Sequence, residues 1–454
     1  MEKRTLVINT SAKQEAVKQY HLIQYTPHIH FQHKEPGACL RASEVKPKLD
    51  KFILAYCKRH NYVLPDECFV LRPGEEKTAL NYKIQIYPKN SEIVRYYIPD
   101  AQRDGYLGNQ NKPRADLTKT VFYPDGLSLS LIIENIKLRN AKNNLIKFQT
   151  LADLIDYVLP AFFLLNCFGA RSTKGYGSYA IRGKQLWDYR RDTQYVKADL
   201  YLREFIDAYY VIEFPRDIRK TDLPKKAIII SNLMKSGYNM TFGNPEDYYK
   251  GRILKYFRDK DMGGDKAFIK QNVLTGKKDR NRNSEDYRSY TKYRFVRTLL
   301  GFGKEIMFVK GVRAGRTAVF KDAKINTANA GDNTEIIRFN NPVHFVPNGQ
   351  YLLIIPTEIP EVMSERRFEV YEKDAETNHA DITTPEIVAV GQHDLRKGKF
   401  NLEEFLDMFM EDFNHQTDFR REDGNYKSPI NQLFNSDRTG EYTLTMIKVG
   451  GSNG

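Results

Sequence analysis

Apolar side chains recur at helical spacing in two segments of the N-terminal half. In residues 46–61, Leu49, Phe52, Ile53 and Tyr56 stand at positions i, i+3, i+4 and i+7, which is the spacing of one face of an α-helix. Pro47 would lie in the first turn, where a missing backbone N–H is tolerated. The pattern therefore predicts an amphipathic helix over residues 46–61.

A second helix is predicted to begin after Thr150. Thr150 and Asp153 have the three-residue spacing of a helix-capping pair, and Pro160 further along predicts a kink. The apolar face expected for this helix consists of Leu151, Leu154, Ile155, Val158, Phe162 and Leu165.

Extended segments surround these two helices. Residues 19–31, interrupted by Pro27, predict an edge or bulged strand, and residues 79–87 and 92–98 predict a hairpin with its turn at 88–91. Further strand signals occupy residues 120–136 and begin again at Tyr179 and Ile181. The order strand, helix, hairpin, helix, strand predicts a ferredoxin-like βαββαβ domain over residues 1–187.

The second half, residues 188–454, repeats this order with long insertions. We expect a strand at 209–214, a helix near 245–257, and paired strands at 336–345 and 351–356 with a turn at 347–349. Asn401 and Glu404 form a capping pattern before an apolar helix, and residues 442–449 predict a closing strand. The fold class expected for the chain is α+β, with two ferredoxin-like domains, the second of them decorated.

Length and composition set broad limits. With 454 residues we expect two or three globular units, and a hydrophobic fraction of 41% excludes global disorder. No apolar run approaches the length of a membrane span, and the charged start lacks the apolar core of a signal peptide. We therefore expect a cytoplasmic protein with no membrane partner.

The four cysteines contain no C-x-x-C pair. Cys39, Cys57, Cys68 and Cys167 are scattered along the chain, which argues against a disulfide framework and against a four-cysteine zinc site. We expect no metal and no cofactor.

The chain is both basic and rich in tyrosine. It has a formal net charge of +14, 29 Tyr and 26 Phe, but one Trp. Lysine and arginine displace counterions from phosphates, and exposed aromatic rings stack on unpaired bases. This composition indicates nucleic-acid binding, and the alternative is a Tyr-rich core beneath a solvated basic surface.

Residues 169–177 form the most informative motif. Three glycines alternate with Arg171, Ser172, Thr173 and Lys174 at a helix-to-strand junction. Glycine allows backbone N–H groups to approach phosphate, while the side chains add charge and hydroxyl donors. The segment matches neither the P-loop nor the Rossmann pattern. The alternative is a simple C-terminal helix cap with a solvated basic tip.

This loop resembles the glycine-rich loop of the RAMP superfamily of CRISPR-associated RNA-binding proteins. A second block, residues 25–31 and 37–52, resembles the strand, loop and first helix of such proteins, where Ser43, Val45 and Lys46 match the usual pattern and Pro47 replaces a glycine. Residues 293–302 and 340–345 resemble the C-terminal half of the first subunit of Cmr-type (type III-B) effector complexes.

The resemblance implies an RNA-binding subunit of a type III CRISPR ribonucleoprotein, acting in antiviral defence with guide or target RNA and other subunits as partners. The RNA-binding residues it implies are Arg41, Ser43, Lys46, Lys48, Gly169, Arg171, Ser172, Thr173, Lys174, Gly175, Tyr176 and Gly177. We expect Lys46 and the glycine loop to share one surface.

Histidines leave a second function open. His28 and His30 lie two residues apart on a predicted strand and so share a face, with His33 close by. They could serve as general acid and base in an endoribonuclease that processes CRISPR RNA. Otherwise they contact RNA or pack beneath the loop. Because no further catalytic partner is evident, we expect a non-catalytic subunit.

Residues 277–297 combine eight basic residues with interleaved aromatic ones. The segment is predicted to be an RNA-contacting arm that becomes ordered on binding, and the alternative is a solvated insertion without a partner.

Overall fold

The computed structural model describes most of the chain and divides it into two compact units. The described residues are 15–30, 38–70, 77–90, 95–96, 120–138, 147–184, 200–216, 218, 222–239, 248–249, 251–274, 292–302, 305–309, 320–326, 339–372, 375–389, 399–414 and 444–451. The first unit is drawn from Met1–Ile206, Arg219–Thr221 and Val346–Gly349, and the second from Asp207–Ile218, Asp222–Phe345 and Gln350–Gly454.

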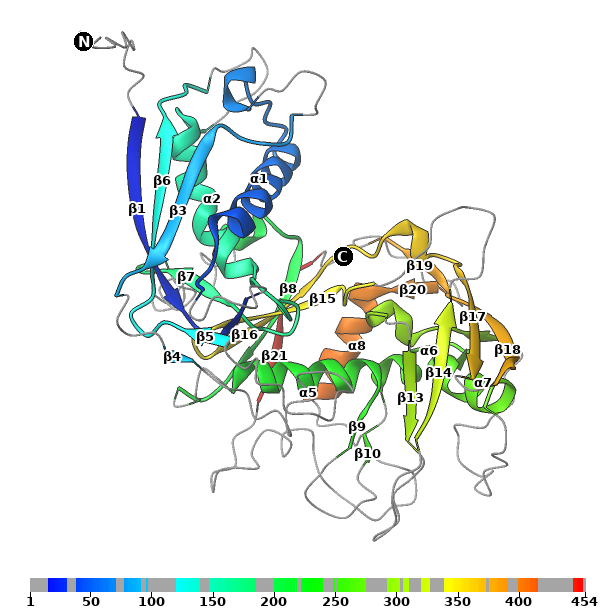
Figure 1. Ribbon diagram of the computed structural model, residues 1–454. Coiled ribbons are helices and arrows are strands. Elements are labelled where there is room, and N and C mark those ends of the chain that lie inside the picture. The colour runs from blue at the N-terminus through cyan, green and yellow to red at the C-terminus, as the bar shows by residue number, and fades with distance from the viewer. Residues whose placement is uncertain are drawn as a thin grey trace, which may run out of the picture. The chain divides into compact units, whose positions relative to one another are not determined.

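A four-stranded antiparallel sheet forms the centre of the first unit (Figure 1). Its strands are β1 (Glu15–Gln24), β3 (Tyr82–Pro88), β6 (Leu127–Glu134) and β7 (Tyr179–Ile181), in the order β3-β6-β1-β7. Helix α1 (Ala42–Arg59) lies between β1 and β3 in the chain, and α2 (Leu151–Leu165) lies between β6 and β7.

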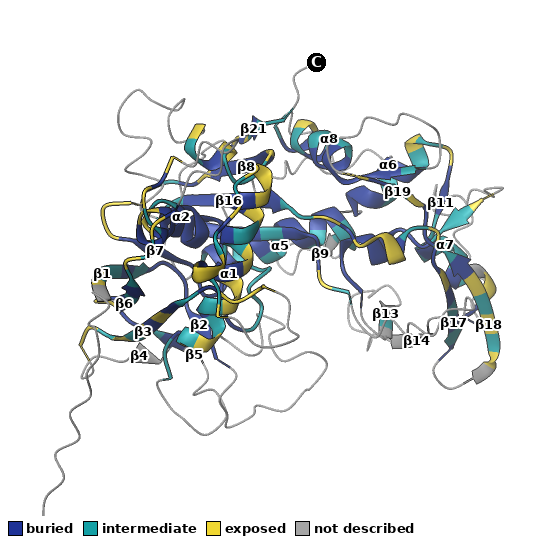
Figure 2. Ribbon diagram, turned by 90° about the horizontal axis from the view of Figure 1, so that it is seen from above, coloured by how far each residue is buried: buried dark blue, intermediate teal, exposed yellow. Residues whose placement is uncertain are grey.

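The apolar core of this unit is formed by the two helices together with the sheet and neighbouring loops. Helix α2 is buried along nearly its whole length, as Figure 2 shows, and α1 buries Val45, Leu49 and Ile53 against it and the sheet. The predicted capping box is confirmed, because Thr150 Oγ1 accepts from Asp153 N at 3.2 Å while Asp153 Oδ2 accepts from Thr150 N at 3.0 Å.

Two local predictions in this unit were wrong. Helix α1 begins at Ala42, so Pro47 lies inside the helix rather than in its first turn. Within the described residues, the two strands of the predicted hairpin belong to different sheets: β3 pairs with β6, and β4 (Arg95–Tyr96) pairs with β5 (Thr120–Phe122). Strand β5 also pairs with β2 (His28–Ile29). An alternating pattern identifies a strand but not its partner.

The second unit contains a sheet with the same order of connections. Its strands are β8 (Ala208–Glu213), β15 (Val343–Asn348), β16 (Tyr351–Pro356) and β21 (Met446–Gly450), in the order β15-β16-β8-β21. Residues 346–348 of β15 are grouped with the first unit. Helix α5 (Leu223–Lys235) follows β8, and α8 (Leu402–Asn414) follows β16 with further strands between them. The predicted α+β class is thus observed.

Sequence patterns placed some elements of this unit incorrectly. The helix expected at 245–257 is α6 (Arg252–Asp259), and neither α5 nor α7 (Asp265–Asn272) was predicted. The turn expected at 347–349 is shifted, because β15 continues through Asn348.

A second four-stranded sheet decorates this unit. It contains β13 (Glu305–Val309), β14 (Phe320–Asn326), β17 (Arg367–Glu372) and β18 (Ala375–Thr383), in chain order. Smaller pairs are β9 (Tyr238–Asn239) with β10 (Tyr248–Tyr249), β11 (Gly263–Gly264) with β12 (Tyr293–Arg294), and β19 (Glu386–Val388) with β20 (Lys399–Asn401). Short 3₁₀ helices are Asp66–Cys68, Arg297–Leu300 and Glu361–Met363.

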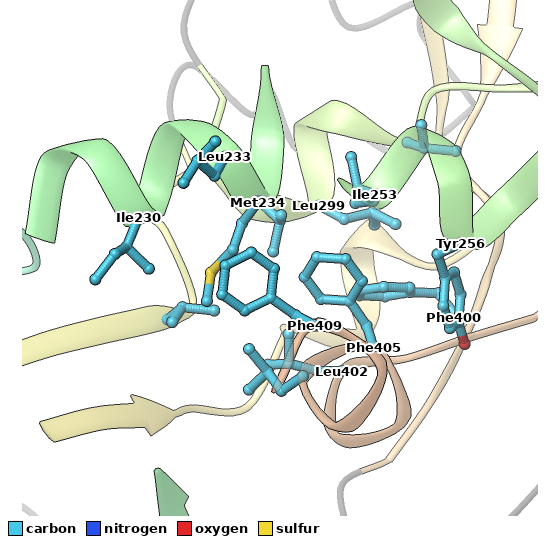
Figure 3. Packing of buried hydrophobic residues seen from close by; sticks show 14 of the residues in the cluster. Ile230, Leu233, Met234, Ile253, Tyr256, Leu299, Phe400, Leu402, Phe405 and Phe409 are labelled. Carbon is cyan, nitrogen blue, oxygen red and sulfur yellow. The ribbon is translucent and has the colours of Figure 1, made fainter. Parts of the chain in front are cut away.

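Aromatic side chains of α8 and its neighbours fill the core of the second unit. Figure 3 shows Phe405 and Phe409 of α8 directed towards α5 and α6, where Met234 and Tyr256 meet them. The predicted cap of α8 is confirmed, since Asn401 Oδ1 accepts from the N–H groups of Glu403 and Glu404 at 2.9 and 3.1 Å. Within the described residues, no helix is both long enough and apolar enough to cross a membrane.

Candidate nucleic-acid interface

The glycine loop, residues 169–177, connects α2 to β7 as predicted. Gly169, Gly175 and Gly177 have φ angles of +80°, +84° and +69°, in the left-handed region that side chains disfavour. A Cβ on Gly169 would lie 2.4 Å from the carbonyl oxygen of Ile29, and one on Gly177 would lie 2.0 Å from that of Phe168. The glycines therefore allow the loop to lie directly against β2.

The amides of these glycines are hydrogen bonded inside the protein. Gly177 N donates to Pro27 O at 2.8 Å, Gly169 N to Glu44 Oε1 at 2.5 Å, and Gly175 N to Ser172 O at 3.2 Å. A phosphate would consequently be bound by the side chains at the tip of the loop rather than by the glycine amides.

Thr26, which was not among the predicted site residues, is hydrogen bonded to the end of the glycine loop and to the residue after it. Its hydroxyl donates to Gly175 O at 2.7 Å and accepts from Ser178 N at 3.0 Å, and the side chain is fully buried. A threonine beside a proline carries no local signal of such a role, because both partners are about 150 residues away.

The loop tip consists of Arg171, Ser172, Thr173 and Lys174, all partly exposed. Arg171 has a φ of +57°, an unfavourable conformation for a residue with a side chain. Burial and the neighbouring charge of Arg171 lower the pKa of Lys174 to about 8. Tyr176, in contrast, is 2% exposed, so its ring lies in the interior rather than at the surface.

The start of α1 meets this loop. Glu44 accepts the Gly169 amide, and the Lys48 ammonium lies 3.6 Å from the Glu44 carboxylate and 5.0 Å from the centroid of the Phe168 ring. Arg41, the N-cap residue, and Ser43 are exposed. Glu44 was not among the predicted site residues, although its four-residue spacing from Lys48 is typical of a helical ion pair.

Lys46 interacts with residues outside the glycine loop. Its ammonium donates to Asp50 Oδ2 at 2.7 Å and to Leu80 O at 2.9 Å, and it lies 4.4 Å from the centroid of the Tyr82 ring. Of the predicted cations of α1, Lys48 lies beside Phe168, which precedes the glycine loop, while Lys46 contacts Leu80 and Tyr82 at the start of β3.

His28 and His30 are interior residues. They are 1% and 4% exposed, and the His28 ring lies 6.1 Å from that of Tyr179. Burial, followed by the positive charges of His30, Lys48 and Arg41, lowers the pKa of His28 to about 3. The imidazole is therefore neutral at physiological pH and supports the loop, because a Cβ on Gly177 would lie 3.0 Å from its Nδ1. His33 lies outside the described residues.

Metal-ligating groups do not cluster in the part of the chain that the structure describes, where no three His, Cys, Asp or Glu side chains could hold one ion. The four cysteines are free thiols, and burial raises the pKa of Cys57, Cys68 and Cys167 to about 12.

The end of the predicted RNA-contacting arm belongs to the core. Phe295 is 1% exposed, and Arg297 Nε donates to the buried carboxylate of Asp265 at 2.7 Å. Residues 295–297 were therefore wrongly assigned to an exposed arm, because the sequence does not distinguish an arginine in a buried ion pair from one in solvent. Residues 277–291 lie outside the described part of the chain.

The sequence also matches models of known protein families. Residues 16–238 match the Cmr1 N-terminal domain, and residues 248–432 match the Cmr1 C-terminal domain. A comparison with curated proteins gave no significant match. Because the two family matches together span most of the sequence, this chain belongs to the Cmr1 family of type III-B CRISPR-associated proteins.

Proposed function

We propose that the chain is an RNA-binding subunit of a type III-B effector complex and that it holds guide or target RNA in antiviral defence in the cytoplasm. The RNA surface consists of Arg41 and Lys48 at the start of α1 and Arg171 and Lys174 at the loop tip, here called the basic rim. Ser43, Ser172 and Thr173 add hydroxyl donors beside it. Both units are assigned to the ferredoxin-like fold on their shared order of strands and helices, and the division at residue 187 stays a prediction.

One observation supports this proposal: the glycine loop is hydrogen bonded to Pro27 and Ile29 and to Glu44 at the start of α1, so the loop and the helix start that carry the four cations of the basic rim are joined to each other. The charges of Lys48 and Arg41 are close enough to His28 to disfavour its protonation, and His28 lies directly beneath Gly169 and Gly177. The carboxylate of Glu44 accepts from the Gly169 amide and lies 3.6 Å from the Lys48 ammonium, so it offsets one of the four positive charges and leaves the others in excess. Such an excess of positive charge attracts a polyphosphate backbone.

The endoribonuclease alternative receives less support. A general acid or base for RNA cleavage works best with a pKa near the working pH and with access to the 2′-hydroxyl. His28 has a pKa of about 3 and both histidines are buried. The His28→Ala, His30→Ala variant should therefore leave RNA cleavage by the assembled complex intact wherever the loop still folds.

The test is the salt dependence of RNA binding. Replacing Arg171 and Lys174 by Ala should weaken binding to all single-stranded sequences. The negative slope of log affinity against log salt should become shallower by about 1.4, at roughly 0.7 for each of the two lost phosphate contacts. The matched control replaces Lys51 and Lys58, two exposed lysines further along α1, and should leave the slope unchanged. Equal slopes for the loop variant and the wild type would contradict the proposal.

A further inference from the structure

Strand β1 is paired over most of its length on one side but only near its C-terminal end on the other. Residues 15–22 pair with β6, whereas β7 pairs with residues 22–24 alone and one further bond joins Arg182 N to His21 O at 2.8 Å. Among the described residues, no strand pairs with the outer side of residues 15–20. Figure 1 shows this part of β1 at the outer margin of its sheet, beyond the end of β7.

In an antiparallel sheet, successive residues of a strand direct their N–H and C=O groups alternately to the two neighbouring strands, which identifies the groups of β1 that face the uncovered side. Because His21 O accepts from Arg182 N, odd-numbered residues of β1 direct their N–H and C=O towards the β7 side. Val17 and Gln19 therefore present both groups outward, along an edge of six residues that is about 20 Å long. An uncovered edge of this kind is a template for another strand.

A cavity of about 240 Å³ lies beside this edge, where β7 would continue if it were longer. It is lined by Gln19, Tyr20 and His21 of β1, by Asp156 and Pro160 of α2, and by Ile181, Arg182 and Lys184. This volume is below the roughly 300–1,000 Å³ of typical small-molecule sites. The cavity therefore suits individual side chains of a docked strand better than a cofactor.

The charge of the cavity is positive. Asp156 is already occupied, because it accepts from the Lys18 ammonium at 3.1 Å and from the Tyr20 hydroxyl at 2.8 Å. Arg182 and Lys184 are exposed and form no ion pair in the described part of the chain. Val17, at 58% exposure, adds an apolar side chain on the same strand. Acidic and apolar side chains complement such a surface.

We propose that the outer edge of β1 docks an extended, acidic peptide segment from another subunit of the effector complex, which adds to the sheet as a further strand. The inference rests on membership of the family and on this edge, and is independent of RNA binding at the basic rim. A peptide can hydrogen bond to the open N–H and C=O groups of β1 because it carries both donors and acceptors at the spacing of a strand, whereas a phosphate backbone offers acceptors only.

Hydrogen exchange on the full chain tests this proposal. The amides of Val17 and Gln19 should exchange rapidly in the isolated protein and become protected in the complex reconstituted with its partner subunits. Strand β3, the opposite edge of the same sheet, should keep its exchange rate. Protection produced by RNA alone, equal protection of β3, or no protection in the complex would each overturn the proposal.

Two variants provide an independent readout. Val17→Pro removes an N–H that points outward and leaves the pairing with β6 intact, so incorporation into the complex should weaken about tenfold while RNA affinity is retained. Val17→Thr, which keeps the N–H, is the matched control. The double variant Arg182→Glu, Lys184→Glu should also weaken incorporation into the complex. Because both residues are exposed, this variant should fold, and it tests the proposal even if Val17→Pro does not fold. Full incorporation of the charge-reversed variant would overturn the proposal.

Discussion

Replacing Gly177 by alanine tests whether close packing holds the glycine loop in place. Gly177 has a φ of +69°, and an added Cβ would lie 2.0 Å from Phe168 O. Gly183 provides a matched control, because its φ is +77° but no atom lies within 4 Å of the position that an added Cβ would occupy. Both variants carry the cost of a side chain in the left-handed region, about 1–2 kcal/mol. Only Gly177→Ala adds a collision with the backbone.

That collision can be relieved only by moving the loop. Movement would weaken the bonds from Gly177 N to Pro27 O and from Phe168 N to Gly177 O, at 2.8 and 2.9 Å. Each such bond contributes about 0.5–1.5 kcal/mol net. We therefore expect Gly183→Ala to lower the free energy of unfolding of the first unit by about 1–2 kcal/mol, and Gly177→Ala to lower it by about 2–5 kcal/mol.

The assay is hydrogen exchange of α2 peptides across a urea series, which reports the unfolding free energy of the first unit separately from the second. RNA affinity should fall with Gly177→Ala and remain with Gly183→Ala, because only the former displaces the basic rim. Equal destabilisation by the two substitutions would refute the idea that the loop is fixed by its contact with the backbone.

Three further predictions concern the charges of the site. The pKa of His28 falls from 6.5 to about 3 on folding, so between these values the unfolded chain binds a proton that the folded chain does not. The free energy of unfolding should therefore drop by about 2 kcal/mol between pH 7 and 5, and His28→Gln should remove this dependence. A His28 imidazole that titrates near 6.5 by NMR would contradict the prediction. Arg171→Gly should be about 1 kcal/mol more stable than Arg171→Ala, because both variants lose the arginine contacts but only alanine keeps a side chain at the φ of +57°, and both should weaken RNA binding; equal stability of the two variants would show that φ at this position is unstrained. Because the pKa of Lys174 is about 8, RNA affinity should decline from pH 7.5 to 9 in the wild type but not in Lys174→Arg, and identical pH profiles would exclude Lys174 as a contact.

Long periodic helices with local caps could be predicted from the sequence. Helices α2 and α8 begin where Thr150 and Asn401 indicated, because a cap acts over three residues that are adjacent in the chain. Helix α5 was missed, since its Ile228-Ile229-Ile230 run is apolar without a clear period and its helical face is set by packing against distant strands.

Partners far apart in the chain could not be predicted. The resemblance to a Cmr-type subunit is confirmed by the two family matches, and the glycine loop lies at the predicted junction. The roles of Thr26 and Glu44 depend on contacts with residues more than 100 positions away. Spacing shows that His28 and His30 share a face but not that this face is buried.

Photocrosslinking can establish whether the basic rim holds RNA. The full chain would be crosslinked to a single-stranded RNA containing 4-thiouridine, and the crosslinked peptides would be mapped by mass spectrometry. We expect crosslinks in the glycine loop, residues 169–177, and at the start of α1, residues 41–48, both lost in the Arg171→Ala, Lys174→Ala variant. Crosslinks confined to other segments, and unchanged in that variant, would contradict RNA binding at the basic rim.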